Sequence, residues 1–79
     1  MSNAVDDAMV EVADADSAVV QAEFNVKQAQ VELLAAQKKP DQADVNQAEI
    51  NVKQAQVELL AAQKKLKAAQ EKLQKAQES

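Results

Sequence analysis

Few residues of this sequence could carry out chemistry. Acidic side chains come in close pairs, Asp6 with Asp7 and Asp14 with Asp16, and carboxylates of this kind could hold a cation weakly. Residues two apart on a helix do not face the same way, however, so Asp14 and Asp16 are expected to form a solvated acidic face. The chain has no His, Cys or Gly, which excludes Cys/His metal sites and Gly-rich phosphate loops. We therefore predict no enzyme, and no catalytic, cofactor or metal site.

The composition instead predicts an all-α protein. Its 79 residues include one Pro, one Phe and no Trp or Tyr, and they are rich in Ala, Gln, Glu and Lys, which are good helix formers. A β-sandwich or α/β fold needs turn residues every dozen positions or so, and only Pro40 is present. With one aromatic residue and many Ala, there is little bulk for a compact globular core.

An internal repeat divides the chain. The segment NVKQAQVELLAAQKK occurs at 25–39 and again, unchanged, at 51–65, with a period of 26 residues. Between the copies stands Pro40, which disfavours helix at the residue before it, followed by Asp41, a good helix N-cap. We therefore expect a helix at about 5–38, a loop at 39–41 and a helix at about 42–78, forming one hairpin over 5–79. Residues 1–4 look like a remnant of an expression vector.

Both expected helices carry an uninterrupted heptad pattern, which is typical of a coiled coil. Every a position is Val or Leu and every d position is Ala. The seam residues are Val5, Ala8, Val12, Ala15, Val19, Ala22, Val26, Ala29, Leu33 and Ala36, then Val45, Ala48, Val52, Ala55, Leu59, Ala62, Leu66, Ala69, Leu73 and Ala76. In one unbroken helix, the heptad patterns of the two halves would be out of phase and the apolar stripe would shift near Pro40. This again indicates a loop between them.

Folding back on itself places each large seam residue against an Ala. In this antiparallel register, paired residue numbers sum to 81, as for Val26 and Ala55, and the turn centres on Pro40 and Asp41. Acidic residues dominate the start of the chain and Lys its end, so the same alignment brings Glu11 opposite Lys72. The sequence thus predicts a long two-helix antiparallel coiled-coil hairpin with Val or Leu at a and Ala at d.

A second apolar stripe lies away from this seam, at heptad positions b and f. It contains Val10 and Val20, and its expected partner interface comprises Phe24, Val31, Leu34, Ile50, Val57 and Leu60. One interpretation is a set of scattered surface hydrophobic residues, which are common. The other is a contact surface for protein partners or for self-association. A membrane-surface helix is less favoured, because the stripe lacks Trp and a basic border.

Charge and hydropathy restrict the classes of partner that we expect. The net charge of −4 argues against nucleic acid, and no apolar run approaches the ~20 residues of a membrane span. We expect no small-molecule substrate and no membrane insertion. We also expect a fragment of a larger protein, without a targeting signal of its own.

Two family resemblances suggest functions. The Gln/Ala/Lys-rich stretch AEINVKQAQVELLAAQKKLKAAQEKLQKAQ at 48–77 resembles the coiled-coil stalks of Gram-positive cell-wall surface proteins, including surface-exclusion-like proteins. The stretch LLAAQKKPDQADVNQAE at 33–49 resembles the tip of the α-hairpin of membrane-fusion (periplasmic adaptor) proteins, although it lacks the Arg of channel-docking tips. In that family, hairpins pack side by side into a tube.

These resemblances imply a structural protein of the bacterial cell surface or envelope. Our first expectation is a coiled-coil spacer or stalk segment that mediates spacing and protein–protein contact. The alternative is an adaptor hairpin in a secretion or efflux assembly. A generic cytosolic coiled-coil interaction module is the third.

Overall fold

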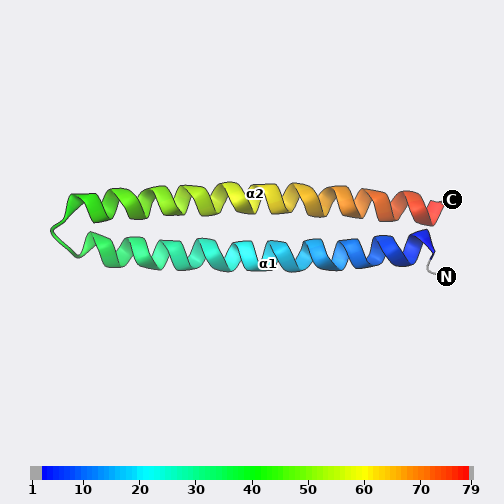
Figure 1. Cartoon of the computed structure of the whole chain (residues 1–79), viewed down its shortest axis with the longest axis horizontal. Coiled ribbons are helices and arrows are strands. Elements are labelled where there is room, and N and C mark those ends of the chain that lie inside the picture. Colours follow the sequence, from blue (N-terminus) through cyan, green and yellow to red (C-terminus); the bar gives the residue numbers. More distant parts are fainter. Residues whose placement is uncertain (1–2, 79) are drawn as a thin grey trace.

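The chain folds into two long antiparallel helices joined by a short loop. The computed structural model describes residues 3–78, in which α1 spans Ala4–Gln37 and α2 spans Gln42–Glu78. The helices lie side by side along a rod of 60 × 15 × 14 Å (Figure 1). This confirms the predicted all-α helical hairpin. The expected vector remnant at residues 1–4 lies partly outside the described residues, which begin at Asn3.

Asn3 caps the start of α1. Its side-chain Oδ1 accepts a hydrogen bond from the backbone N–H of Asp6 (2.8 Å), and its backbone carbonyl accepts one from the N–H of Asp7 (3.1 Å). These contacts satisfy donors that have no partner within the helix. The negative charges of Asp6 and Asp7 also suit the positive end of the helix dipole.

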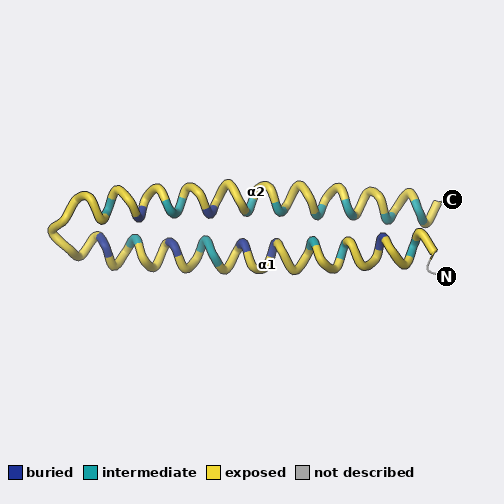
Figure 2. Tube along the Cα trace, in the orientation of Figure 1, coloured by how far each residue is buried: buried dark blue, intermediate teal, exposed yellow. Residues whose placement is uncertain are grey.

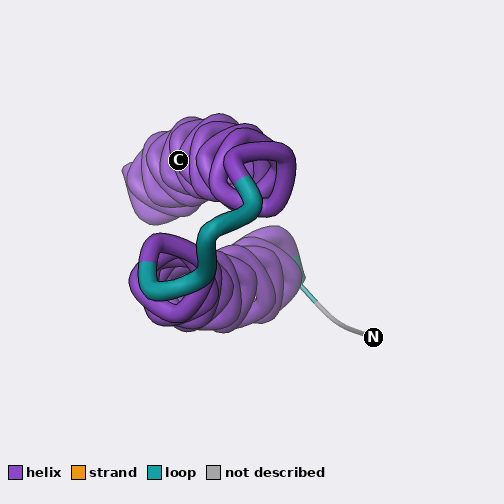
Figure 3. The backbone as a smooth tube through the Cα atoms, turned by 90° about the vertical axis from the view of Figure 1, so that its left-hand side faces the viewer, coloured by secondary structure: helices purple, strands orange, loops and turns teal. Residues whose placement is uncertain are grey.

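The loop closes without a left-handed residue. The N–H groups of Lys38 and Lys39 donate to the carbonyls of Ala35 (3.3 Å) and Ala36 (3.0 Å), so the last turn of α1 tightens into 3₁₀ geometry and α1 ends one residue before the expected position. Pro40 cannot continue the helix. Seen from this end, the loop crosses directly from one helix to the other (Figure 3).

Asp41 begins α2. Its Oδ1 accepts a hydrogen bond from the backbone N–H of Ala43 (2.9 Å), which is the N-cap contact that its residue type favours. Asp44 adds a second negative charge in the first turn of α2.

The core is a single seam between the helices. All ten a and d positions of each helix are buried or half-buried, and nearly every other described residue is exposed (Figure 2). The fully buried positions are mostly Ala, namely Ala8, Ala22, Ala29, Ala36, Ala48 and Ala55, together with Val19. Because the Ala side chain is a single methyl group, Ala at the contact lets two helices approach closely. Most of the larger Val and Leu residues of the seam are half-buried.

The two copies of the repeat cross each other within this seam. In the register whose residue numbers sum to 81, residues 21–34 lie antiparallel to residues 47–60, and these stretches differ only at Phe24 and Ile50. The middle of the rod therefore has a pseudo-twofold axis that relates each residue n to residue n + 26. The ion pair between Lys72 Nζ and Glu11 Oε1 (3.1 Å) confirms the alignment near the open end.

Candidate functional site

The expected interface residues lie on the outside of the rod. On α1, Phe24, Val31 and Leu34 are all exposed, and Val10 and Val20 extend the same stripe toward the N-terminus. From Val10 to Leu34 the stripe is about 36 Å long, at ~1.5 Å per residue. Whether these side chains contact a partner stays a prediction.

The stripe on α2 is the pseudo-symmetric counterpart of the stripe on α1. Val31 and Val57 are each 65% exposed, and Leu34 and Leu60 are 61% and 58% exposed. Phe24 corresponds in the same way to Ile50. The six expected interface residues are thus three pairs related by the repeat, and all six are exposed.

The two stripes point to opposite flanks of the rod. At about 100° per residue, positions b and f lie roughly 150° around each helix from the a/d seam. The α1 stripe and the α2 stripe therefore cannot contact one partner helix together. Each stripe is an independent surface, and the chain offers two of them.

Polar contacts mark the edges of the repeat in both helices. Gln21 Nε2 donates to Asn25 Oδ1 (3.0 Å), and Gln47 Nε2 donates to Asn51 Oδ1 at the same distance. Both Asn residues are half-buried beside the seam. These i, i+4 bonds hold the Asn side chains against the helix surface.

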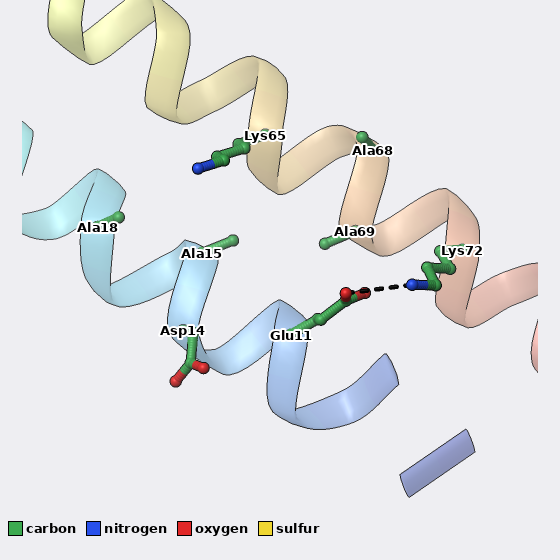
Figure 4. Close-up of a pocket in the computed structure, with 8 residues that line it drawn as sticks. All are labelled: Glu11, Asp14, Ala15, Ala18, Lys65, Ala68, Ala69 and Lys72. Atoms are coloured by element: carbon green, nitrogen blue, oxygen red, sulfur yellow. Dashed lines mark hydrogen bonds and ion pairs between the residues drawn. The ribbon is translucent and has the colours of Figure 1, made fainter. Parts of the chain in front are cut away.

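A shallow groove of about 430 Å³ lies at the open end of the hairpin, where Ala residues leave space along one edge of the seam (Figure 4). The Glu11–Lys72 ion pair spans it, the Lys65 side chain reaches toward the space between the helices, and Asp14 points away. The ion-pair side chains are 50% and 67% exposed. Solvent therefore screens the pair, and such pairs contribute ~0–1 kcal/mol.

The lining of this groove combines small apolar residues with four charged side chains. The groove is lined by Ala together with Glu11, Asp14, Lys65 and Lys72. Across residues 3–78, no cluster of three or more potential ligands could hold a metal ion. Over the same range, neither helix contains a stretch apolar and long enough to cross a bilayer.

Sequence reasoning missed two features of the surface. Met9 is 54% exposed and adjoins Val10, so it widens the stripe at the N-terminal end of α1. Its e position beside an apolar f residue was the available signal. Asn25 and Asn51 are half-buried although they lie outside the a/d pattern, and each accepts a hydrogen bond from the Gln four residues earlier.

No known family model matches this chain, and no curated protein or solved structure does either. The function must therefore be argued from the geometry of the hairpin and the residues on its surface.

Proposed function

We propose that this chain is a structural coiled-coil arm, a spacer and protein-contact segment of a larger bacterial surface protein. One observation carries the proposal: both ends of the described chain lie at the same end of a 60 Å rod (Figure 1). Any domain joined to either end would sit there, and the loop at Pro40 would project about a rod's length away.

A hairpin and a single continuous helix place the two chain ends at very different separations. A single continuous helix over residues 4–78 would separate its two ends by roughly 110 Å. The hairpin separates the loop from both ends and keeps the ends together. In a single copy, the loop and the sides of the rod therefore project away from the chain ends. A single copy does not hold two domains attached at its ends apart.

The surface agrees with a contact role. The described part of the chain has two exposed apolar stripes on opposite flanks, and such stripes mark interaction sites more often than catalytic ones. The location at the bacterial surface follows from the likeness of its Gln/Ala/Lys-rich repeats to cell-wall stalks.

The second candidate is the hairpin of a membrane-fusion adaptor in a secretion or efflux assembly. The adjacent chain ends and the two outward stripes favour it, because a projecting hairpin with a surface on each flank can pack between neighbours. The absence of Arg from the stretch 38–41 counts against docking of the tip on a channel.

Resonance energy transfer between two reporters tests the arm. Donor and acceptor fluorescent proteins are fused to the N- and C-termini, and transfer is measured at high dilution with a tenfold excess of unlabelled chain. We expect efficient transfer within one chain that is lost in urea together with helicity, so that the unfolded state serves as the internal control. Weak transfer at full native helicity would mean an open helix with its ends apart, and would overturn the arm in favour of an in-line stalk.

A further inference from the structure

The outer face of α1 has the residue pattern of a second coiled-coil seam. Its b and f positions recur at alternating steps of three and four along the helix, which is the spacing of the buried a and d positions. Between residues 10 and 34, Ser17 and Lys27 are the only polar members of this series. In the hairpin these side chains are exposed, and no large side chain of the described residues is fully buried.

We propose that a second copy of this chain covers this face, with α1 packed antiparallel on α1 about a twofold axis near Ala22. In the proposed register, residue numbers of facing positions sum to 44. The register rests on the sequence of the face and on the hairpin structure. It is independent of the arm proposed above, because it concerns the mass of the assembly and not the position of the chain ends.

Among the antiparallel arrangements of α1 on α1, apolar matching selects this register. Val10 faces Leu34 of the second copy, Ala13 faces Val31 of the second copy, and Val20 faces Phe24 of the second copy. The twofold axis repeats each layer, so six layers are apolar on both sides. Sliding α1 by one heptad either way leaves only two such layers.

Packing that uses the α2 stripe is poorer. Consider α1 packed on α2 of another copy, in the register that brings the ends of the two rods closest to level. The α2 residues Lys53, Lys64 and Lys67 then face Val31, Val20 and Ser17 of α1, respectively. Only two layers are apolar on both sides. The α2 stripe ends at Leu60, and Lys64 and Lys67 continue its positions, so α1 on α1 is the best-matched pairing of these faces.

Charge complementarity supports the same register. Lys38 faces Asp6 of the second copy at each end of the seam, and Lys27 faces Ser17 of the second copy beside Asp16. Within the hairpin, facing seam positions have numbers that sum to 81, whereas the flanking residues of the Glu11–Lys72 ion pair sum to 83, two more. The same offset in the dimer brings Glu23 opposite Glu23 of the second copy, which is the unfavourable contact of this interface.

The length of the seam is also sufficient. From Asp6 to Lys38 it runs about 48 Å, close to the length of the hairpin's own seam, so the contact would bury an area similar to that between α1 and α2. In this register the two rods lie side by side with their ends level, since residue 4 of one copy lies beside residue 40 of the other.

Each hairpin has its chain ends, and so its attachment points, at one end of the rod. The dimer would have attachment points at both ends and could act as a spacer. Because the copies are antiparallel, the chain ends of one copy lie beside the loop of the other. The two attachment points are then held about one rod length apart, at the 60 Å long dimension of the hairpin.

The repeat supplies a matched pair of variants for the test. Val31→Gln and Val57→Gln make the same substitution in the same 15-residue segment, at positions with equal exposure. Sedimentation velocity from 1 to 500 μM should show the wild type shifting from the 8.5 kDa chain to twice that mass. We expect Val31→Gln to raise the dissociation constant about tenfold or more, because, through the twofold axis, it removes the apolar contact of Val31 with Ala13 twice per dimer, and Val57→Gln to leave it unchanged.

The remaining outcomes are equally decisive. A wild type that stays monomeric at 500 μM, or a higher oligomer weakened equally by both variants, would overturn the α1–α1 dimer. Gln has at least the helix propensity of Val, so circular dichroism should show both variants fully helical. Glu23→Gln should tighten the dimer by removing the facing carboxylates, and unchanged or weaker association would refute the register.

Discussion

The segment 25–39 and its copy 51–65 have nearly the same surroundings in the rod but different ends. In both copies the first Val of the segment is half-buried and the Ala three residues later is buried. In both, a Gln four residues before the leading Asn donates a hydrogen bond to it. Yet the helix of the first copy ends at Gln37, whereas the second copy lies wholly inside α2.

The comparison separates what a helical sequence decides alone from what its neighbours decide. The heptad positions of the repeat determine which side faces the partner helix, since the same positions of both copies are buried or half-buried. Where the helix ends depends on the next residues. Pro40 follows Lys39, whereas Leu66 follows Lys65 and continues the helix.

The outer face differs for the same reason. Within the repeat the stripes are equivalent, but α1 extends its stripe through Val20 and Val10, whereas α2 continues with Lys64 and Lys67. In the proposed dimer, the two copies would therefore differ in their capacity to pair with another chain. This inequality is what the comparison of Val31→Gln with Val57→Gln measures.

The largest expected effect comes from filling the buried Ala positions of each copy. Ala29→Leu and Ala55→Leu should each lower the free energy of unfolding by ~1–3 kcal/mol, because the close seam has no room for the added bulk. Ala29 and Ala55 are equally buried, so the two costs should agree. Urea unfolding followed by circular dichroism measures both.

Ala35→Leu and Ala61→Leu serve as the matched controls. These Ala residues occupy equivalent exposed positions in the two copies, and the substitution should change stability by no more than about 0.5 kcal/mol. A rise in stability from Ala29→Leu or Ala55→Leu would mean that the seam is misassigned. Costs that differ by more than about 1 kcal/mol between the copies would break their equivalence.

A smaller effect is expected at the boundary that distinguishes the copies. Asp41→Ala removes the acceptor for the Ala43 N–H and should cost about 1 kcal/mol of stability, typical for loss of an N-cap. Asp41→Asn keeps the acceptor and should be nearly neutral. Thermal unfolding of both variants gives the comparison, and an equal loss from both would assign the effect to charge rather than to capping.

Much of this fold was predictable from the sequence because the pattern is redundant. The a and d residues, Pro40 with Asp41, and the acid–base distribution each indicate the same hairpin, and every expected seam position is protected. The structure ends α1 at Gln37, next to the expected boundary at about 38. The 3₁₀ bonds from Lys38 and Lys39 that close this end leave no signature in residue type.

The expected interface residues were predictable as positions on the helix surface, and their contact with a partner stays a prediction. Phe24 and Ile50 are recognisable from the sequence as corresponding apolar residues of the 26-residue repeat, off the seam, but their exposed fractions of 60% and 49% come only from the structure. The seam itself does not forbid a slip of one heptad, since Val or Leu would still face Ala. The short loop at 38–41 and the Glu11–Lys72 pair select the observed register.

Disulfide trapping tests that register most directly. Ala29→Cys with Val52→Cys places one thiol in each copy of the repeat, in facing layers of the seam, while Ala29→Cys with Leu59→Cys displaces the second thiol by one heptad, about 10.5 Å. Under mild oxidation at low micromolar concentration, the first chain should form an intrachain disulfide quantitatively, and the second should not, because its thiols lie beyond disulfide reach. Efficient closure of the displaced pair, or none in the facing pair, would contradict the hairpin register on which the account rests.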